Sequence, residues 1–196
     1  MHLLERDIPD FRLMHGPDPL PAFPPGAPLP AVSKPMSARN IGLRTAGTND
    51  MRFLRALFHA LKSEELPLEH WPEPFKQAFL DQQFALQHMQ YVDRYPGADF
   101  WIVEHRNQPI GRYYLLREPS RYHIVDITLE PAWRGRGIGS LLLDWAQSLA
   151  RRHGAAGISL QVDERNKDAQ RLYARYGFVE TSRESPYIAM QWKTAA

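Results

Sequence analysis

Residues 134–140 read Arg-Gly-Arg-Gly-Ile-Gly-Ser and separate a strand-like run from an amphipathic helical stretch. Glycines permit backbone conformations that other residues rarely adopt, and they leave the main chain uncovered where the helix begins. The first N–H groups of a helix have no intrahelical partner and lie at the positive end of its dipole, so this junction favours an anion, above all a phosphate. Arg134 and Arg136 add positive charge. The alternative is a glycine-rich turn with solvated arginines.

The segments on either side of the loop have the periodicities of a strand and a helix. Residues 123–131 alternate, which predicts a strand with Val125, Ile127 and Leu129 on one face. The same alternation places Asp126 and Glu130 on the face opposite His123. After the loop, apolar residues recur with helical spacing up to Arg151–Gly154, which suit a helix end. The inward positions of this helix are Ile138, Leu141, Leu142, Trp145, Ala146 and Leu149.

Two common phosphate loops do not fit this segment. A Walker loop needs Gly-Lys followed by Ser or Thr, and residues 134–140 contain no lysine. In a dinucleotide fingerprint the third glycine would fall one residue later than Gly139. The pattern that fits is Arg-x-x-Gly-x-Gly. It resembles the signature at the start of the central helix of the GNAT-superfamily N-acetyltransferases.

Three further segments carry the same resemblance. Leu43–Ala46, followed by Asp50, is similar to the first strand and turn of the family. Ile158–Val162, followed by Asn166, resembles the fifth strand and the asparagine beyond it. Residues 169–178 match the signature Ala-x-x-Leu-Tyr-x-x-x-Gly-Phe without a gap. Together the four signatures, in order, cover roughly residues 41–193 and are far more specific than any one of them.

The resemblance implies an α/β (α+β) fold of the GNAT type. Its sheet is mixed, mostly antiparallel and six- to seven-stranded, with about four flanking helices in the order βααβββαβαββ. We expect two segments, a proline-rich N-terminal arm over residues 1–40 and a GNAT acetyltransferase domain over residues 41–196. Nine of the seventeen prolines lie at or before Pro35, so we expect the arm to be extended, either disordered or laid across the domain.

Hydrophobic patterns place the individual elements. Helices are expected after Asp50, from Pro74 to about Val92, and over 167–176, with strands near 99–105, 109–116, 157–162, 178–182 and 186–193. The inward positions expected in the second of these helices are Phe75, Phe79, Leu86 and Met89.

The resemblance also implies acetyl-CoA as co-substrate and assigns residues to it. The cofactor-binding residues it implies are Leu129, through its backbone, and Arg134, Gly135, Arg136, Gly137, Ile138, Gly139, Ser140, Asn166 and Tyr173. Asn166 could instead cap the following helix, and both roles are compatible.

Two residues are catalytic candidates. Tyr173 is the candidate general acid for the leaving thiolate, because a phenol can donate a proton. Its alternative is packing, since it shares a stripe with Ala169, Leu172 and Tyr176. His123 is the candidate general base, at a position where relatives often carry a glutamate. A lone histidine at a strand end is more often structural or exposed.

Composition limits the function classes. The formal net charge is only +2, which does not favour nucleic acid as a partner. There are no cysteines, hence no disulfide or thiol nucleophile, and no apolar run is long enough to span a membrane. No pair of the eight histidines is spaced i, i+4, so no metal is expected. Cytoplasmic localisation is the resulting expectation.

The predicted activity is N-acetyl transfer from acetyl-CoA to a primary amine of a small molecule, peptide or protein, by direct attack in a ternary complex. The absence of a cysteine nucleophile favours direct attack. Glu64, Glu65, Glu69 and Glu73, with His70 and Trp71, form an acidic loop that would attract a cationic amine or simply be solvated. The alternative function is a non-catalytic acyl-CoA-binding or interaction module. A homodimer is left open.

Overall fold

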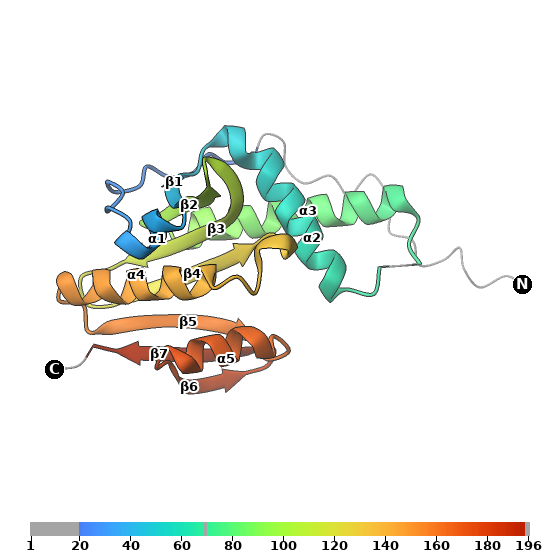
Figure 1. The fold of residues 1–196 in the computed structure, drawn as a ribbon. Helices are drawn as coiled ribbons and strands as arrows, with labels where there is room; N and C mark the ends of the chain where they lie inside the picture. Colours follow the sequence, from blue (N-terminus) through green and yellow to red (C-terminus); the bar gives the residue numbers. More distant parts are fainter. Residues whose placement is uncertain (1–19, 69, 195–196) are drawn as a thin grey trace, which may run out of the picture. The chain divides into compact units, whose positions relative to one another are not determined.

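The computed structural model describes residues 20–68 and 70–194 (Figure 1). Contacts divide the chain into two compact units, one formed by residues 47–96 with the segment ending at Phe23, the other by residues 24–46 and the chain from Gly97 onward. The second unit holds the sheet.

The chain forms seven strands and five α-helices within the described residues. The strands are β1 Ile41–Thr45, β2 Ala98–His105, β3 Gln108–Arg117, β4 Tyr122–Leu129, β5 Gly157–Asp163, β6 Val179–Glu184 and β7 Tyr187–Lys193. The helices are α1 Lys34–Ala38, α2 Met51–Glu65, α3 Glu73–Arg94, α4 Ile138–Arg152 and α5 Lys167–Arg175.

The predicted order βααβββαβαββ is confirmed, with one helix added in front of it. Helix α1 lies in the segment expected to be extended, and that expectation was wrong for residues 34–38. Pro35 occupies the first turn of the helix, where its missing N–H costs no hydrogen bond. Met36 is fully buried in the core of the sheet unit, and the Trp145 indole donates to the carbonyl of Ala31 (2.9 Å). The proline-rich segment from residue 24 onward therefore belongs to the sheet unit.

The sheet has seven strands in the order β1-β2-β3-β4-β5-β7-β6. Every neighbouring pair is antiparallel except β4 and β5, so the predicted mixed, mostly antiparallel sheet is confirmed. The turn between β2 and β3 uses Arg106 and Asn107, both with positive φ (50° and 62°), as a tight hairpin turn requires.

Strands β4 and β5 are paired only at their beginnings. The parallel ladder runs from Tyr122–Ile158 to Ile124–Leu160, and β4 then continues to Leu129 without β5. A bulge explains the divergence: on the β3 side, Leu115 pairs with Ile124 but Tyr114 pairs with Asp126, which leaves Val125 as the extra residue. Because a bulge bends and twists its strand, β4 turns away from β5 beyond it (Figure 1).

Helix α4 buries the face that its spacing predicts. Ile138, Leu142, Trp145, Ala146 and Leu149 are at most 2% exposed, whereas Leu141 is only partly buried. The Trp145 ring meets the Trp101 ring edge-on, with centroids 5.3 Å apart. This packing fixes the start of α4, and with it the glycine loop, against the sheet.

The helical unit pairs α2 with α3, and the Phe58 and Phe84 rings meet at 5.9 Å. The predicted inward face of α3 was wrong. The buried residues are Leu80, Phe84, Ala85 and His88, while Leu86 is 50% exposed. The pattern of apolar residues could not reveal His88 as buried. Its Nε2 bonds the carbonyl of Pro21 (2.7 Å), and its ring packs against the Phe23 ring in a T-shaped arrangement.

Gly111 should tolerate no side chain. It pairs with Leu129 at the end of β4, and a Cβ there would lie 2.4 Å from the Thr128 carbonyl oxygen. We expect Gly111→Ala to lower the free energy of unfolding by about 1–3 kcal/mol through overpacking. Gly42→Ala on β1, where a Cβ meets nothing within 4 Å, is the matched control. Urea denaturation of both variants measures the difference, and equal losses would contradict the close approach.

Candidate active site

The loop that joins β4 to α4 holds two glycines in the left-handed region. Gly135 has φ +70° and Gly137 has φ +75°, conformations that favour glycine. Gly139 serves packing instead, because a Cβ there would lie 3.1 Å from Leu172 Cδ2 on α5. The three glycines therefore shape the turn and bring α5 close to the start of α4.

The main chain of this loop carries unused donors. The first hydrogen bond that closes α4 runs from the Leu141 N–H to the Gly137 carbonyl (3.2 Å). Within residues 20–68 and 70–194, no acceptor is found for the N–H groups of residues 135–140. Six consecutive N–H groups at the positive end of a 15-residue helix are suited to a diphosphate.

Both predicted arginines lie at the loop. Arg134 Nε donates to the Leu129 carbonyl (3.1 Å), and the Arg136 guanidinium stacks on the Trp133 ring (4.9 Å). The arginines on the other side of the proposed site are engaged elsewhere: Arg165 forms a two-pronged ion pair with Asp163 (2.7 and 3.0 Å), and Arg171 pairs with Asp168. Of these four arginines, the two in the loop therefore supply the positive charge next to the glycines.

Because β4 diverges from β5, backbone N–H groups of β4 next to the loop have no partner strand among the described residues. The Glu130 N–H donates to Ile110 on β3 (2.9 Å). Successive N–H groups of a strand point to opposite sides, so the N–H groups of Leu129 and Ile127 point away from β3. That side is where β5 leaves β4 after the Ile124–Leu160 pair. The backbone of β4 is therefore open to a ligand on this side, and pairing of Leu129 with the cofactor stays a prediction.

Tyr173 lies on α5 in the core of the sheet unit. It is 9% exposed, and its ring meets Phe178 at 5.8 Å. Burial, and secondarily the negative charge of Asp126, raise the pKa of Tyr173 above its ordinary value of 10. The neutral form is thus favoured, so the phenol keeps its proton at neutral pH. Its hydroxyl makes no hydrogen bond to another residue in the described part of the chain.

His123 lies where β4 and β5 are still paired. Its Nδ1 is 3.0 Å from the Ser159 hydroxyl, and that hydroxyl also lies 3.3 Å from the Tyr122 carbonyl. A carbonyl can only accept, so Ser159 donates to Tyr122 and accepts from His123 Nδ1–H. This arrangement places the basic lone pair of the neutral ring on Nε2.

The bulge corrects the expected faces of β4. Residue 123 pairs with Leu116, residue 126 pairs with Tyr114, and Leu116 and Tyr114 share a face. Asp126 therefore lies on the same face as His123, not on the opposite one. Its two oxygens accept from Arg112 (2.8 Å) and from the Thr128 hydroxyl (2.6 Å), so Asp126 is an ion-pair partner and a poor candidate for the base.

The structure resolves the alternatives for Asn166 in part. Its side-chain oxygen accepts from the Ala169 N–H (3.0 Å), which makes it the N-cap of α5. Contact with a cofactor stays a prediction.

Tyr113 on β3 was not singled out from sequence. It is fully buried, and its hydroxyl finds no partner in the described part of the chain. Burial, and then the proximity of Tyr173 and Tyr122, raise the pKa of its hydroxyl. Alternation in β3 predicts only that the residue is buried, so no sequence signal marks it.

The acidic loop belongs to the helical unit. Glu64 and Glu65 end α2 and Glu73 begins α3, while Glu69 lies outside the described residues. Glu65 pairs with Lys62 (2.5 Å) and Glu73 accepts from Gln77 (2.6 Å). Across the described ranges, no helix is long and apolar enough to cross a membrane, and no metal-binding group of acidic residues and histidines is found.

The comparison with known families agrees with this geometry. The Acetyltransferase (GNAT) family profile matches residues 57–178, more than half of the chain. The chain belongs to the GNAT acetyltransferase family. The family resemblance of the sequence is therefore confirmed, and with it the class of acetyl-CoA-dependent N-acetyltransferases.

Relatives within the GNAT family act on different amines. The aminoalkylphosphonate N-acetyltransferase of Salmonella typhimurium is 27% identical over 71% of this chain and 85% of its own length. The peptidyl-lysine N-acetyltransferase YjaB of the same organism is 33% identical, but the match covers only 46% of this chain and 57% of that protein.

Solved structures share the fold. The PaiA N-acetyltransferase of Thermoplasma acidophilum, solved with coenzyme A, has a TM-score of 0.61 at 16% identity and covers 79% of this chain and 99% of its own. A GNAT acetyltransferase from Elizabethkingia anophelis with acetyl-CoA bound has a TM-score of 0.53 at 17% identity over 79% and 99%.

Gly135 and Gly154 offer a matched pair for the loop. Both have φ +70°, and a Cβ at either meets nothing within 4 Å. Alanine at each should therefore cost a similar backbone strain, about 1 kcal/mol. Only Gly135→Ala should weaken binding of coenzyme A, because its methyl group occupies the space beside the open N–H groups. Calorimetry on both variants tests this, and equal affinities would contradict the site.

Proposed function

We propose that this GNAT enzyme acetylates a primary amine by direct attack on acetyl-CoA bound between the glycine loop and the diverging strands β4 and β5. The observation that carries the proposal is the continuity of open main-chain donors. They run from the part of β4 that β5 leaves into the N–H groups of residues 135–140. A molecule with a diphosphate at one end and an amide-containing arm fits that sequence of groups.

Each part of the site would hold one part of the co-substrate. The N–H groups from Gly135 to Ser140, with Arg134 and Arg136, would bind the diphosphate. The β4 backbone at Leu129 would pair with the pantetheine arm, and Asn166 would contact the cofactor near the start of α5. A main-chain N–H aimed at the thioester carbonyl stabilises the oxyanion that forms during attack.

Tyr173 would act on the departing sulfur. Attack by the amine breaks the carbon–sulfur bond and leaves a thiolate, which needs a hydrogen-bond donor or a proton. The buried phenol stays protonated because desolvation raises its pKa. The protonated hydroxyl can then donate a hydrogen bond, or its proton, to the departing sulfur.

His123 would receive the proton of the amine. An alkyl ammonium has a pKa of about 10, so at neutral pH most of the acceptor must lose a proton before it attacks. The Ser159 contact holds the imidazole with Nε2 as the basic atom (3.0 Å from Nδ1 to Oγ). A water molecule could relay the proton where the amine is not in direct contact.

The acceptor is a primary amine of a small molecule or of a peptide. The relatives named above act on both classes, so family membership leaves the choice to experiment. A non-catalytic acyl-CoA-binding module is the other class, and the presence of both Tyr173 and Asn166 favours the enzyme. The test is thiol release from acetyl-CoA with a panel that includes aminoalkylphosphonates and lysine peptides. Tight coenzyme A binding without release for any amine would favour the module.

Tyr173→Phe should lower kcat by about 10²- to 10³-fold, because the donor for the thiolate is lost. The KM for acetyl-CoA should change little, since the ring remains. Because the raised pKa keeps the phenol neutral, this deficit should be constant up to about pH 10. Tyr176→Phe, whose hydroxyl bonds Asp144 (3.3 Å), is the control. Wild-type turnover by Tyr173→Phe would remove the assignment.

His123→Gln should reduce the rate most at neutral pH. As the pH approaches 10, more of the amine is already deprotonated in solution, so the deficit should shrink. Ser159→Ala should lower the rate less, with the same pH dependence. This substitution removes only the hydrogen bond that orients the His123 ring and leaves the base in place. The measurement is kcat/KM for the amine from pH 6.5 to 9.5. A deficit that does not vary with pH would exclude His123 as the base.

A further inference from the structure

Arg39 reaches the glycine loop from a segment outside the matched family region. It follows α1, which precedes β1 and residue 57, where the family match starts. Met36 anchors α1 in the core at 0% exposure, and the Arg39 N–H donates to its carbonyl (3.0 Å). The backbone of Arg39 is therefore fixed although its side chain is exposed.

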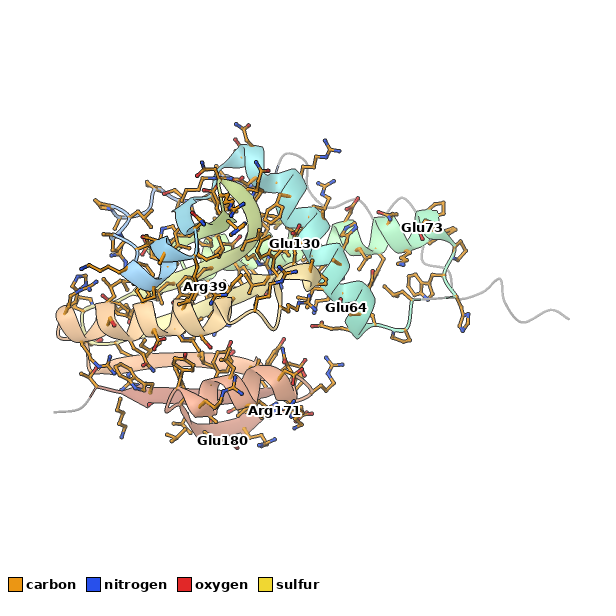
Figure 2. The ribbon with its side chains drawn as sticks, viewed as in Figure 1. Arg39, Glu64, Glu73, Glu130, Arg171 and Glu180 are labelled. Atoms are coloured by element: carbon orange, nitrogen blue, oxygen red, sulfur yellow. The ribbon has the colours of Figure 1, made fainter. Side chains whose placement is uncertain are left out.

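The guanidinium of Arg39 lies directly against the loop. Its Nη2 donates to the Arg136 carbonyl (2.6 Å), and its Nη1 lies 3.4 Å from where a Cβ of Gly137 would be. Figure 2 shows Arg39 beside the start of α4, where the open N–H groups of the loop are. The positive charge thus lies at the same helix end as these donors.

Most of the donors of Arg39 remain available. A guanidinium has five N–H groups in a planar fork, and a single hydrogen bond, to Arg136, is found for this one within the described ranges. Arg134 is bonded to the Leu129 carbonyl, and Arg136 is stacked on Trp133. Arg39 therefore has both a fixed position and spare donors, which is what binding of a phosphate requires.

We infer that Arg39 is a phosphate-binding residue for coenzyme A, supplied by the proline-rich N-terminal segment and held against the glycine loop by the Arg136 carbonyl. This inference rests on the proposed function. Coenzyme A carries a diphosphate and a 3′-phosphate, and a guanidinium binds either through the same chemistry.

The first test is calorimetry of Arg39→Gln with coenzyme A and with 3′-dephospho-coenzyme A. Loss of a charged hydrogen bond should weaken coenzyme A binding by about 10- to 100-fold. If Arg39 binds the 3′-phosphate, the wild-type preference for coenzyme A over the dephospho form should shrink. If it binds the diphosphate, both ligands should weaken alike. Arg121→Gln, at the opposite end of β4 from the loop, removes the same charge as a control.

The second test separates phosphate binding from shaping of the loop. Acetyl-pantetheine lacks every phosphate, so its kcat/KM should be the same for Arg39→Gln and the wild type, while that for acetyl-CoA falls. Equal losses with both substrates would overturn the inference, as would wild-type affinity of Arg39→Gln for coenzyme A or an equal loss in Arg121→Gln. A wild-type protein that binds no coenzyme A would overturn the proposed function as well. Arg39→Lys, which keeps the charge without the fork, should recover only part of the affinity.

Discussion

The parting of β4 from β5 is the constraint on which the rest of the site depends. Most backbone donors in a sheet pair with a neighbouring strand, but here the parallel ladder ends at Ile124 and Leu160. The bulge at Val125 bends β4 while its other edge stays bonded to β3. One edge of β4 is thus bonded to β3, and the other edge is open beyond Ile124. A ligand can therefore bond the backbone of β4 where β5 does not.

The glycine loop extends that open edge into the proposed anion site, and neighbouring groups hold its conformation. The six N–H groups of residues 135–140, for which the described part of the chain offers no acceptor, are tolerable in water, but they gain most from an anion that satisfies several of them at once. Arg134 bonds the carbonyl of Leu129 before the loop, and Arg39 bonds the carbonyl of Arg136 within it. These contacts preorganise the loop, so less conformational entropy is lost when a ligand binds.

Local patterns predicted the order of elements, the glycine loop and the buried face of α4, because each depends on residues close together in the sequence. Three features could not be predicted, because each depends on contacts between different segments of the chain. The bulge at Val125 moved Asp126 to the face of His123, and strict alternation cannot reveal an inserted residue. Helix α3 buries His88 because Pro21 supplies an acceptor from far along the chain. Arg39 meets the loop only after α1 is anchored through Met36.

The central claim is that the main-chain amides at the start of α4 bind the diphosphate of coenzyme A. Amide chemical shifts report it most directly, through ¹H–¹⁵N spectra recorded as coenzyme A is added. The account predicts that the largest shifts fall on the amides from Gly135 to Ser140 and on Leu129, with little change on β6. Binding that leaves these amides unmoved, or that shifts only a distant surface, would contradict it.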